Sequence, residues 1–201
     1  MPFIINKTKD GRFFTNFEVP KLTRFPKEGV FRHTLSSYMT TKIYMSPLGP
    51  LLLVAEQGNL VYCNWREPEC SKKEKRIIGD AVLEESLAEH KILEKTEAQL
   101  DEYFKGERER FELPVKLTGT EFQIKVWQNI MNVPYGGVAS YKSLALAAGC
   151  EGGYRAVAQA CGNNPVAVIV PCHRIVASDG KMGGYTGGRD KKEWLLKHET
   201  Y

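Results

Sequence analysis

The chain has 201 residues, which is enough for one sizeable domain or for two small domains that share an interface. Hydrophobic residues make up 42% and charged residues 26%, the composition of a globular protein, and no apolar run reaches the length of a membrane span. The formal net charge of +4 is a mild excess that does not by itself indicate a nucleic-acid partner. The five cysteines lack the spacing of a disulfide framework and the first residues lack a secretory signal, so we expect a cytoplasmic protein, or a nuclear one in a eukaryotic source.

Residues 1–40 show no clear hydrophobic period but hold several phenylalanines, which is too aromatic for a flexible tail. We expect this segment to be an N-terminal extension that packs on the body of the protein. From Thr41 onward three short apolar runs follow, separated by the turn signals Pro47–Pro50 and Gln57–Asn59. The pattern predicts a small antiparallel sheet whose strands contain Ile43–Met45, Leu51–Ala55 and Leu60–Trp65.

Residues 82–105 predict a helix that ends at Gly106. The residues expected on its apolar face are Leu93, Leu100, Tyr103 and Phe104. Pro114 then lies in a connecting segment, where we place a domain boundary. The predicted divisions are an extension at 1–40, an N-terminal α/β domain at 41–114 and a C-terminal domain at 115–201.

The second half is predicted to be mostly helical. Thr120–Gln123 has the pattern of a capping box, which opens a helix that Pro134–Gly137 ends. The residues expected on the inner face of this helix are Phe122, Val126, Trp127, Ile130 and Met131.

Two shorter helices are predicted to follow. Ser140 can cap the first, Tyr141–Ala148, and a turn that contains glycine leads to the second, Tyr154–Gly162. Together they are typical of a helix-turn-helix, although many helical hairpins of this kind bind nothing. The residues expected on one side of the second helix are Tyr154, Val157, Ala158 and Cys161.

The clearest chemical signal comes after this pair of helices. Val166–Val170 predicts a buried, extended segment, and Pro171 fixes the backbone directly before Cys172. A cysteine reacts as its thiolate, so a base has to take its proton. His173 is adjacent, but neighbouring side chains of an extended chain point to opposite sides, so proton transfer needs a water relay or a turn at this point. An isolated Cys-His pair is usually a core thiol beside a surface imidazole, and it is the rigid lead-in and the upstream helix-turn-helix that favour a reactive cysteine.

In these motifs the sequence resembles the O6-alkylguanine-DNA alkyltransferases, also called methylated-DNA–protein-cysteine methyltransferases. The resemblance runs from about Thr41 to the C-terminus and is densest from Gly119 to Glu199. Its central motif is Val170-Pro171-Cys172-His173-Arg174-Ile175-Val176. The supporting motifs, in the family's order and spacing, are Gly119-Thr120-Glu121-Phe122-Gln123, Pro134-Tyr135-Gly136, Ser140-Tyr141, Arg155-Ala156-Val157, Asn164-Pro165, Gly183–Gly188 and Lys192–Leu196.

The resemblance implies an α+β fold. A small antiparallel-sheet N-terminal domain of the ribonuclease H-like type would precede a mostly helical C-terminal domain with a winged-helix-like helix-turn-helix. It also implies a DNA repair protein that binds double-stranded DNA containing O6-alkylguanine, flips the damaged nucleotide out and transfers the alkyl group to Cys172 in one irreversible turnover. O4-alkylthymine is left open as a further substrate. We expect a monomer that requires no cofactor and contacts no membrane.

The same resemblance assigns catalytic roles. Cys172 would be the alkyl acceptor, and His173 would act as its base through a water molecule. Glu199 would hold and polarise His173, which follows the logic of a nucleophile, a base and a residue that orients the base. Asn164 would brace the active-site turn.

Substrate-binding and DNA-binding roles follow from it as well. Tyr141 would offer its hydroxyl to a ring nitrogen of guanine, while the backbone carbonyls of Cys172 and Ile175 would accept from the exocyclic amine. Tyr185 and the backbone at Thr186 would line the base pocket. The residues expected to contact DNA are Arg155, as the finger that replaces the flipped nucleotide, and Gln123, Lys142 and Ser178 along the phosphate backbone.

Some members of the family carry zinc in the N-terminal part, but the candidates in this sequence lack finger-like spacing, so we expect no metal. Those candidates are His33, Cys63, Cys70 and His90. One alternative function is a DNA-binding regulator that binds lesions without transfer, although relatives of that kind have Trp in place of the cysteine. A second alternative is a Cys-His hydrolase of small esters or peptides, which would need neither the helix-turn-helix nor Arg155.

Overall fold

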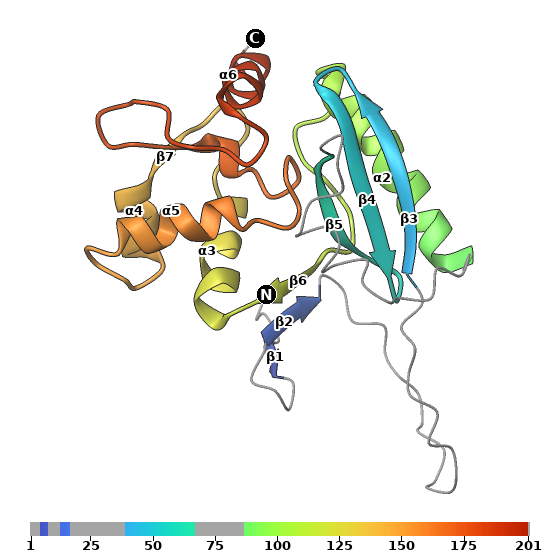
Figure 1. Ribbon diagram of the computed structural model, residues 1–201, viewed down its shortest axis with the longest axis horizontal. Coiled ribbons are helices and arrows are strands. Elements are labelled where there is room, and N and C mark those ends of the chain that lie inside the picture. The colour runs from blue at the N-terminus through green and yellow to red at the C-terminus, as the bar shows by residue number, and fades with distance from the viewer. Residues whose placement is uncertain (1–4, 8–12, 17–38, 67–86, 201) are drawn as a thin grey trace, which may run out of the picture.

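The computed structural model describes residues 5–7, 13–16, 39–66 and 87–200. Within these residues a three-stranded sheet and a long helix form one side of the molecule, and a group of shorter helices forms the other (Figure 1). The α+β arrangement predicted from the sequence is therefore confirmed.

The sheet consists of β3 (Met39–Ser46), β4 (Gly49–Glu56) and β5 (Asn59–Trp65), which pair antiparallel in chain order. The tight turns between them contain glycine at positive φ, with Gly49 at 111° and Gly58 at 72°. Glycine enters this region without the steric cost that a side chain would bring. The three predicted strands are present, and each extends beyond the apolar run that indicated it.

Neighbouring residues of β4 point to opposite faces of the sheet. Leu51, Leu53 and Ala55 belong to the main hydrophobic core. Leu52 and Val54 instead pack with Tyr62 in a smaller cluster on the other face.

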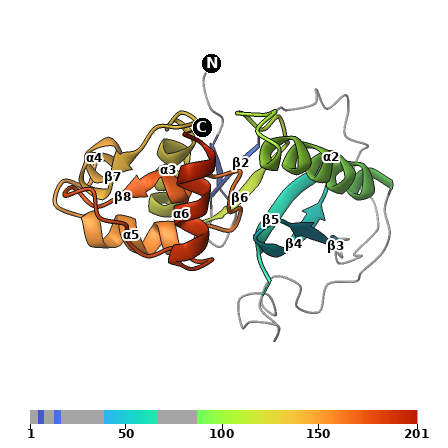
Figure 2. The same cartoon turned by 90° about the horizontal axis from the view of Figure 1, so that it is seen from above.

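The helix α2 (Leu87–Phe104) lies along the sheet (Figure 2) and adds its apolar face to the main core. Leu93, Leu100 and Tyr103 are buried as predicted, whereas Phe104 is half-buried. Gly106 follows the helix with a φ of 77°, in agreement with its predicted role as the stop. The predicted first turn of this helix, residues 82–86, lies outside the described residues.

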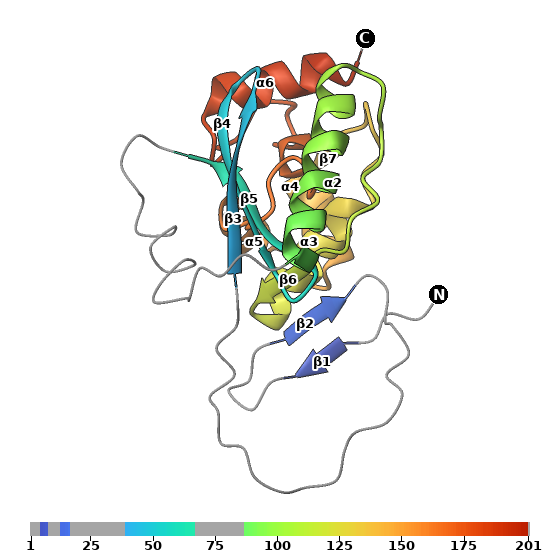
Figure 3. The same ribbon diagram turned by 90° about the vertical axis from the view of Figure 1, so that its right-hand side faces the viewer.

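A second sheet connects the start of the chain to the junction between the two halves. It has the order β1 (Ile5–Lys7), β2 (Phe13–Asn16) and β6 (Lys116–Gly119), all antiparallel (Figure 3). The sequence analysis predicted no strand within residues 1–40, because strands of three and four residues are too short to show a hydrophobic period. Of the other residues in that extension, only Met39 and Thr40 are described, as the start of β3.

The C-terminal half begins with α3 (Glu121–Met131), which has the predicted capping box. The backbone N–H of Gln123 donates to Thr120 Oγ1 at 3.2 Å, and the backbone N–H of Thr120 donates to Gln123 Oε1 at 2.9 Å. Of the predicted inner face, Val126, Trp127 and Ile130 are buried, while Phe122 and Met131 are half-buried.

The predicted helix-turn-helix is formed by α4 (Tyr141–Ala147) and α5 (Tyr154–Gly162), on the side of the molecule away from β3–β5 (Figures 1 and 2). Ser140 caps α4 as expected, since its hydroxyl accepts from the backbone N–H of Ser143 at 2.9 Å.

The predicted apolar side of α5 is partly wrong. Val157 and Cys161 are buried, but Ala158 is exposed and 51% of the surface of Tyr154 is accessible. The helix packs on α3 and α4 through Val157, Ala160 and Cys161, so the buried stripe is rotated away from Tyr154 and Ala158. The outer face of α5 is therefore open for contacts with another molecule.

Two short strands connect the helix-turn-helix to the residues that follow Cys172. β7 (Ala139–Ser140) pairs in parallel with β8 (Ile175–Val176). The last helix, α6 (Arg189–His198), then ends at Glu199, its C-cap residue. No helix in the described part of the chain is long and apolar enough to cross a membrane.

The capping box of α3 gives a prediction about stability. Thr120→Ala removes the side-chain acceptor of one helix N–H and should lower the free energy of unfolding by about 1 kcal/mol. Urea denaturation measures this, with Thr118→Ala on β6 as the control, because Thr118 is exposed and caps no helix. A Thr120→Ala variant as stable as the parent would show that the capping box does not stabilise the fold.

Candidate active site

Cys172 begins a short 3-10 turn, Cys172–Arg174, that follows a tightly folded loop. The segment Val166–Val170 is buried, as predicted, but it is not extended, because the N–H of Val170 donates back to the carbonyl of Val166 at 2.8 Å. Val168 has a φ of 70°, a left-handed conformation that is costly for a β-branched residue. An apolar run indicates burial but not the path of the backbone, which is why the sequence missed this loop.

The side-chain amide of Asn164 holds the loop together. Its Nδ2 donates to the carbonyl of Val170 at 2.8 Å and to Cys172 Sγ at 3.2 Å, while its Oδ1 accepts from the N–H of Val166 at 3.0 Å. The amide thus joins both ends of the loop and also directs an N–H at the sulfur. A hydrogen bond to a thiolate stabilises the charged form, so this contact favours a reactive Cys172.

His173 is fully buried directly after Cys172. Its Nε2 lies 2.7 Å from Glu199 Oε1, whereas its Nδ1 is buried without a hydrogen-bond partner among the described residues. Against an ionised carboxylate, Nε2 carries the proton and Nδ1 keeps a lone pair. The turn that the sequence analysis considered at this point is present, yet Nδ1 makes no direct hydrogen bond to Sγ.

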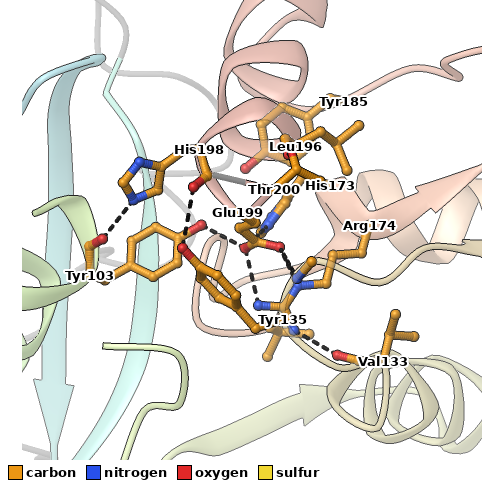
Figure 4. Close-up of polar contacts among 12 residues, drawn as sticks. Tyr103, Val133, Tyr135, His173, Arg174, Tyr185, Leu196, His198, Glu199 and Thr200 are labelled. Carbon is orange, nitrogen blue, oxygen red and sulfur yellow. Dashed lines mark hydrogen bonds and ion pairs between the residues drawn. The ribbon is translucent and has the colours of Figure 1, made fainter. Parts of the chain in front are cut away.

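Glu199 is the centre of the polar contacts drawn in Figure 4. Arg174 donates to both carboxylate oxygens, from Nε to Oε2 at 2.8 Å and from Nη2 to Oε1 at 3.0 Å. Oε1 also receives His173 Nε2 and the hydroxyl of Tyr103, which donates at 2.7 Å. The N–H of Gly136 lies 3.4 Å from Oε2. The described residues therefore supply five donors to one buried carboxylate.

These contacts determine the charges in the site. Burial by itself would raise the pKa of Glu199, but hydrogen bonds from His173 and Arg174 and their charges outweigh it and lower the pKa to about 2. Burial lowers the pKa of His173, and Arg174 and Lys192 lower it further, against the opposing effect of Glu199. Near neutral pH the pair is therefore a neutral imidazole that donates to an anionic carboxylate.

Three consecutive residues at the end of β5 support the site from the N-terminal half. Cys63 exchanges backbone hydrogen bonds with Pro165 and Ala167, at 3.0 and 2.6 Å. The side-chain amide of Asn64 donates to the carbonyl of Asn164 at 3.0 Å. Trp65 Nε1 donates to the hydroxyl of Tyr185 at 3.3 Å. The position of the active-site loop therefore depends on strand β5.

Two tyrosines expected at the substrate are both half-buried near this loop. Burial, followed by the charges of Cys161 and Cys172, raises the pKa of Tyr141 to about 12. A Cβ on Gly183 would lie 2.4 Å from the Tyr141 hydroxyl, so only glycine fits where the chain passes it. The ring of Tyr185 meets His173 edge-on, with 6.4 Å between ring centres.

The two residues whose backbone is expected in the base pocket, Ile175 and Thr186, differ in burial. Ile175 is buried, and its carbonyl accepts from Lys192 Nζ at 2.5 Å. Lys192 is itself fully buried, and its Nζ lies 5.8 Å from the centre of the Tyr141 ring. Thr186 is exposed, with its hydroxyl donating to the carbonyl of Gly162 at 3.0 Å.

The four residues expected at DNA occupy different elements. Arg155 is exposed on the first turn of α5, next to Tyr154. Lys142 is exposed on α4 and lines, together with Tyr154 and Leu146, a hollow of about 480 Å³ between the two helices. Gln123 is half-buried because its side chain caps α3, and Ser178 is exposed in the turn after β8.

The structure describes only two of the four zinc candidates from the sequence. His33 and Cys70 lie outside the described residues. Cys63 is buried in β5, where burial raises the pKa of its thiol to about 12, and His90 is exposed on α2. The expectation of no metal stays a prediction.

The sequence analysis gave no site role to several residues that the structure places in the site. They include Tyr103, Asn64, Trp65, Arg174 and Lys192. Arg174 and Lys192 belong to the quoted motifs, and their positions could have suggested a role. Tyr103 was predicted as a core residue of a helix, and its hydroxyl partner is 96 residues away, so no local pattern indicates the contact.

Two family models match most of the chain. Residues 39–117 match the model described as 6-O-methylguanine DNA methyltransferase, ribonuclease-like domain, and residues 121–201 match the one described as 6-O-methylguanine DNA methyltransferase, DNA binding domain.

Individual proteins agree with these models. The chain is 39% identical over 157 residues to a methylated-DNA–protein-cysteine methyltransferase of Methanosarcina barkeri, which covers 78% of this chain and 94% of that protein. The crystal structure of the Mycobacterium tuberculosis O6-methylguanine methyltransferase is similar, with a TM-score of 0.70 and 33% identity over 81% of this chain and 93% of that one. The structure of Mycobacterium tuberculosis OGT in complex with DNA has a TM-score of 0.68 and 34% identity, over 81% and 92% of the two chains.

The buried charge of Glu199 predicts a specific pH dependence of stability. The folded pKa of about 2 lies below the ordinary value of 4.5, so the stabilisation is complete above that value and is lost as the pH falls towards 2. When the pH is lowered from 6 to 3, the unfolding free energy of the parent should therefore fall by about 2 kcal/mol more than that of Glu199→Gln. Denaturant titration at both pH values measures the difference. Glu193→Gln, which removes an exposed carboxylate on α6, should behave like the parent; a parent-like pH dependence in Glu199→Gln would contradict the assignment.

Proposed function

Because the chain belongs to the methylated-DNA–protein-cysteine methyltransferase family, we propose that it repairs DNA by transferring the alkyl group of O6-alkylguanine to Cys172. The observation that carries this proposal is the sulfur of Cys172, which receives an N–H from Asn164 and is followed directly by the buried His173–Glu199 pair. This is an arrangement of nucleophile, base and orienting carboxylate.

In the proposed reaction the thiol of Cys172 loses its proton before or as it attacks. The acceptor is Nδ1 of His173, which keeps its lone pair because Nε2 donates to Glu199. Since Nδ1 does not contact the sulfur directly, the proton passes through one water molecule. Imidazolium formation is supported by the carboxylate of Glu199, which stays ionised.

The alkyl carbon then moves from oxygen to sulfur. A C–S bond forms as the C–O6 bond breaks, and the electron pair of that bond remains on guanine. Tyr141 suits the role of hydrogen-bond donor to the departing base, because a pKa of about 12 keeps its hydroxyl protonated. The carbonyl of Ile175 has a second lone pair for the exocyclic amine in addition to the one used by Lys192. Tyr185 and the backbone at Thr186 would form the walls of the pocket.

The partner implied by this chemistry is double-stranded DNA. An alkylated base inside a duplex is out of reach, so the nucleotide has to be flipped into the site and its stacking replaced. Arg155 is exposed at the start of α5, and the neighbouring Ala156 is small and exposed, which permits close approach to a groove. These features support Arg155 as the residue that fills the gap in the stack.

A stoichiometric reaction is the direct test of the proposal. A thioether on Cys172 has no good leaving group, so each protein molecule should accept one alkyl group and then stop. Mass spectrometry after mixing with an O6-methylguanine duplex should find one methyl group, on the peptide that contains Cys172. Cys172→Ala should bind the modified duplex and accept nothing. A progress curve that continues well past one equivalent would support a hydrolase instead, and binding without transfer by the parent would support a lesion-binding regulator.

The proposed finger gives a second prediction. Arg155→Ala should slow transfer from duplex DNA by roughly tenfold or more. Flipping a nucleotide costs a few kcal/mol of stacking, and without Arg155 the flipped state loses the contact that offsets part of this cost. Transfer from the free modified base needs no flipping and should be unchanged. Lys197→Ala removes one positive charge from α6, where it pairs with Glu193, and serves as the charge-matched control. Equal losses on both substrates would show that Arg155 has a structural role.

A further inference from the structure

The hydroxyl of Tyr103 contacts the polar centre of the site from the other half of the chain. Tyr103 lies on α2, is fully buried and donates to Glu199 Oε1 at 2.7 Å (Figure 4). Its ring is packed edge-on against Tyr135 and His198, and its carbonyl lies 2.7 Å from His198 Nε2. The position of the hydroxyl is therefore fixed by packing that is independent of Glu199.

The carboxylate does not need Tyr103 for its orientation. Arg174 already binds Glu199 with two parallel hydrogen bonds, one to each oxygen, which fixes the plane of the carboxylate. Tyr103 adds a further donor to Oε1, the same oxygen that receives the proton of His173 Nε2. With Arg174 Nη2 this oxygen has three donors, which compete for its charge, so each hydrogen bond weakens the others.

We propose that Tyr103 is a positioning residue. It weakens the hydrogen bond between Glu199 and His173 and thereby sets the pH at which Cys172 becomes nucleophilic. The proposal rests on the proposed function, in which His173 is the base for Cys172. If Tyr103 has this role, α2 in the N-terminal half takes part in controlling the reactivity of the Cys172 thiol.

The direction of the effect follows from the charged groups around the pair. Arg174 on the 3-10 turn and Lys192 on α6 oppose a proton on His173, and Glu199 favours it. Tyr135, on the turn after α3, has the guanidinium of Arg174 over its ring, and its hydroxyl donates to the carbonyl of His198 at 3.3 Å. Tyr185 meets His173 edge-on and stays uncharged, because burial raises the pKa of its hydroxyl. Removal of the Tyr103 hydroxyl leaves more charge on Oε1 for Nε2–H. The basicity of His173 then rises, and deprotonation of Cys172 shifts to lower pH.

The test is the pH profile of Cys172 alkylation by iodoacetamide, followed by mass spectrometry of the Cys172 peptide between pH 5 and pH 9. Tyr103→Phe should move the midpoint down by about half a unit, which makes the reaction roughly threefold faster on the acidic side of the midpoint. Tyr135→Phe is the matched control, because it removes a hydroxyl from the same aromatic cluster without touching Glu199. Its midpoint should equal that of the parent.

A fluorinated tyrosine at position 103 gives a second measurement that keeps the ring and the hydroxyl. Its phenol is a stronger donor, so the midpoint should move to higher pH. An unchanged midpoint in both Tyr103 variants, or a shift of Tyr103→Phe to higher pH, would overturn the proposal. Methyl transfer from modified DNA by the parent tests the proposed function separately. If the parent transfers the methyl group but the Tyr103 variants have the alkylation midpoint of the parent, the proposed function is supported and the role of Tyr103 is refuted.

Discussion

The buried carboxylate of Glu199 is the interaction on which the rest of the site depends. It accepts from Arg174, His173 and Gly136 in the C-terminal half and from Tyr103 on α2 in the other half. A buried carboxylate without such donors would be protonated or would destabilise the fold. Here the donors lower its pKa to about 2, and the resulting negative charge fixes the proton of His173 on Nε2. The lone pair on Nδ1, the proposed base, is a consequence of that arrangement.

The second constraint is the strained loop before Cys172. Val168 adopts a left-handed conformation, and such strain persists only where the surroundings impose it. Asn164 joins the ends of the loop, and the backbone of Cys63 on β5 pairs with Pro165 and Ala167. The strand next to the loop also places Asn64 against Asn164 and Trp65 against Tyr185. The sheet therefore does more than support the helical half, since it determines where the sulfur lies.

Local signals in the sequence predicted much of this architecture. The capping patterns at Thr120 and Ser140 correctly located the starts of α3 and α4, because a cap involves only neighbouring residues. By resemblance, the motif around Cys172 indicated the proposed nucleophile and its histidine. What the sequence could not show were contacts between distant segments, such as Tyr103 with Glu199, and a backbone path that reverses within an apolar run at Val168. The rotated stripe of α5 was missed for a related reason, because packing against α3 and α4 decides which face is buried.

Burial keeps His173 neutral near pH 7, and Glu199 fixes its single proton on Nε2, which leaves a lone pair on Nδ1. Nitrogen-15 NMR of the protein labelled at histidine measures this state directly, with His173→Gln used to assign the signal. We predict that at pH 7 the Nε2 resonance of His173 has the shift of a protonated nitrogen and the Nδ1 resonance that of an unprotonated one. An imidazolium at that pH, or a proton on Nδ1 instead of Nε2, would contradict the account.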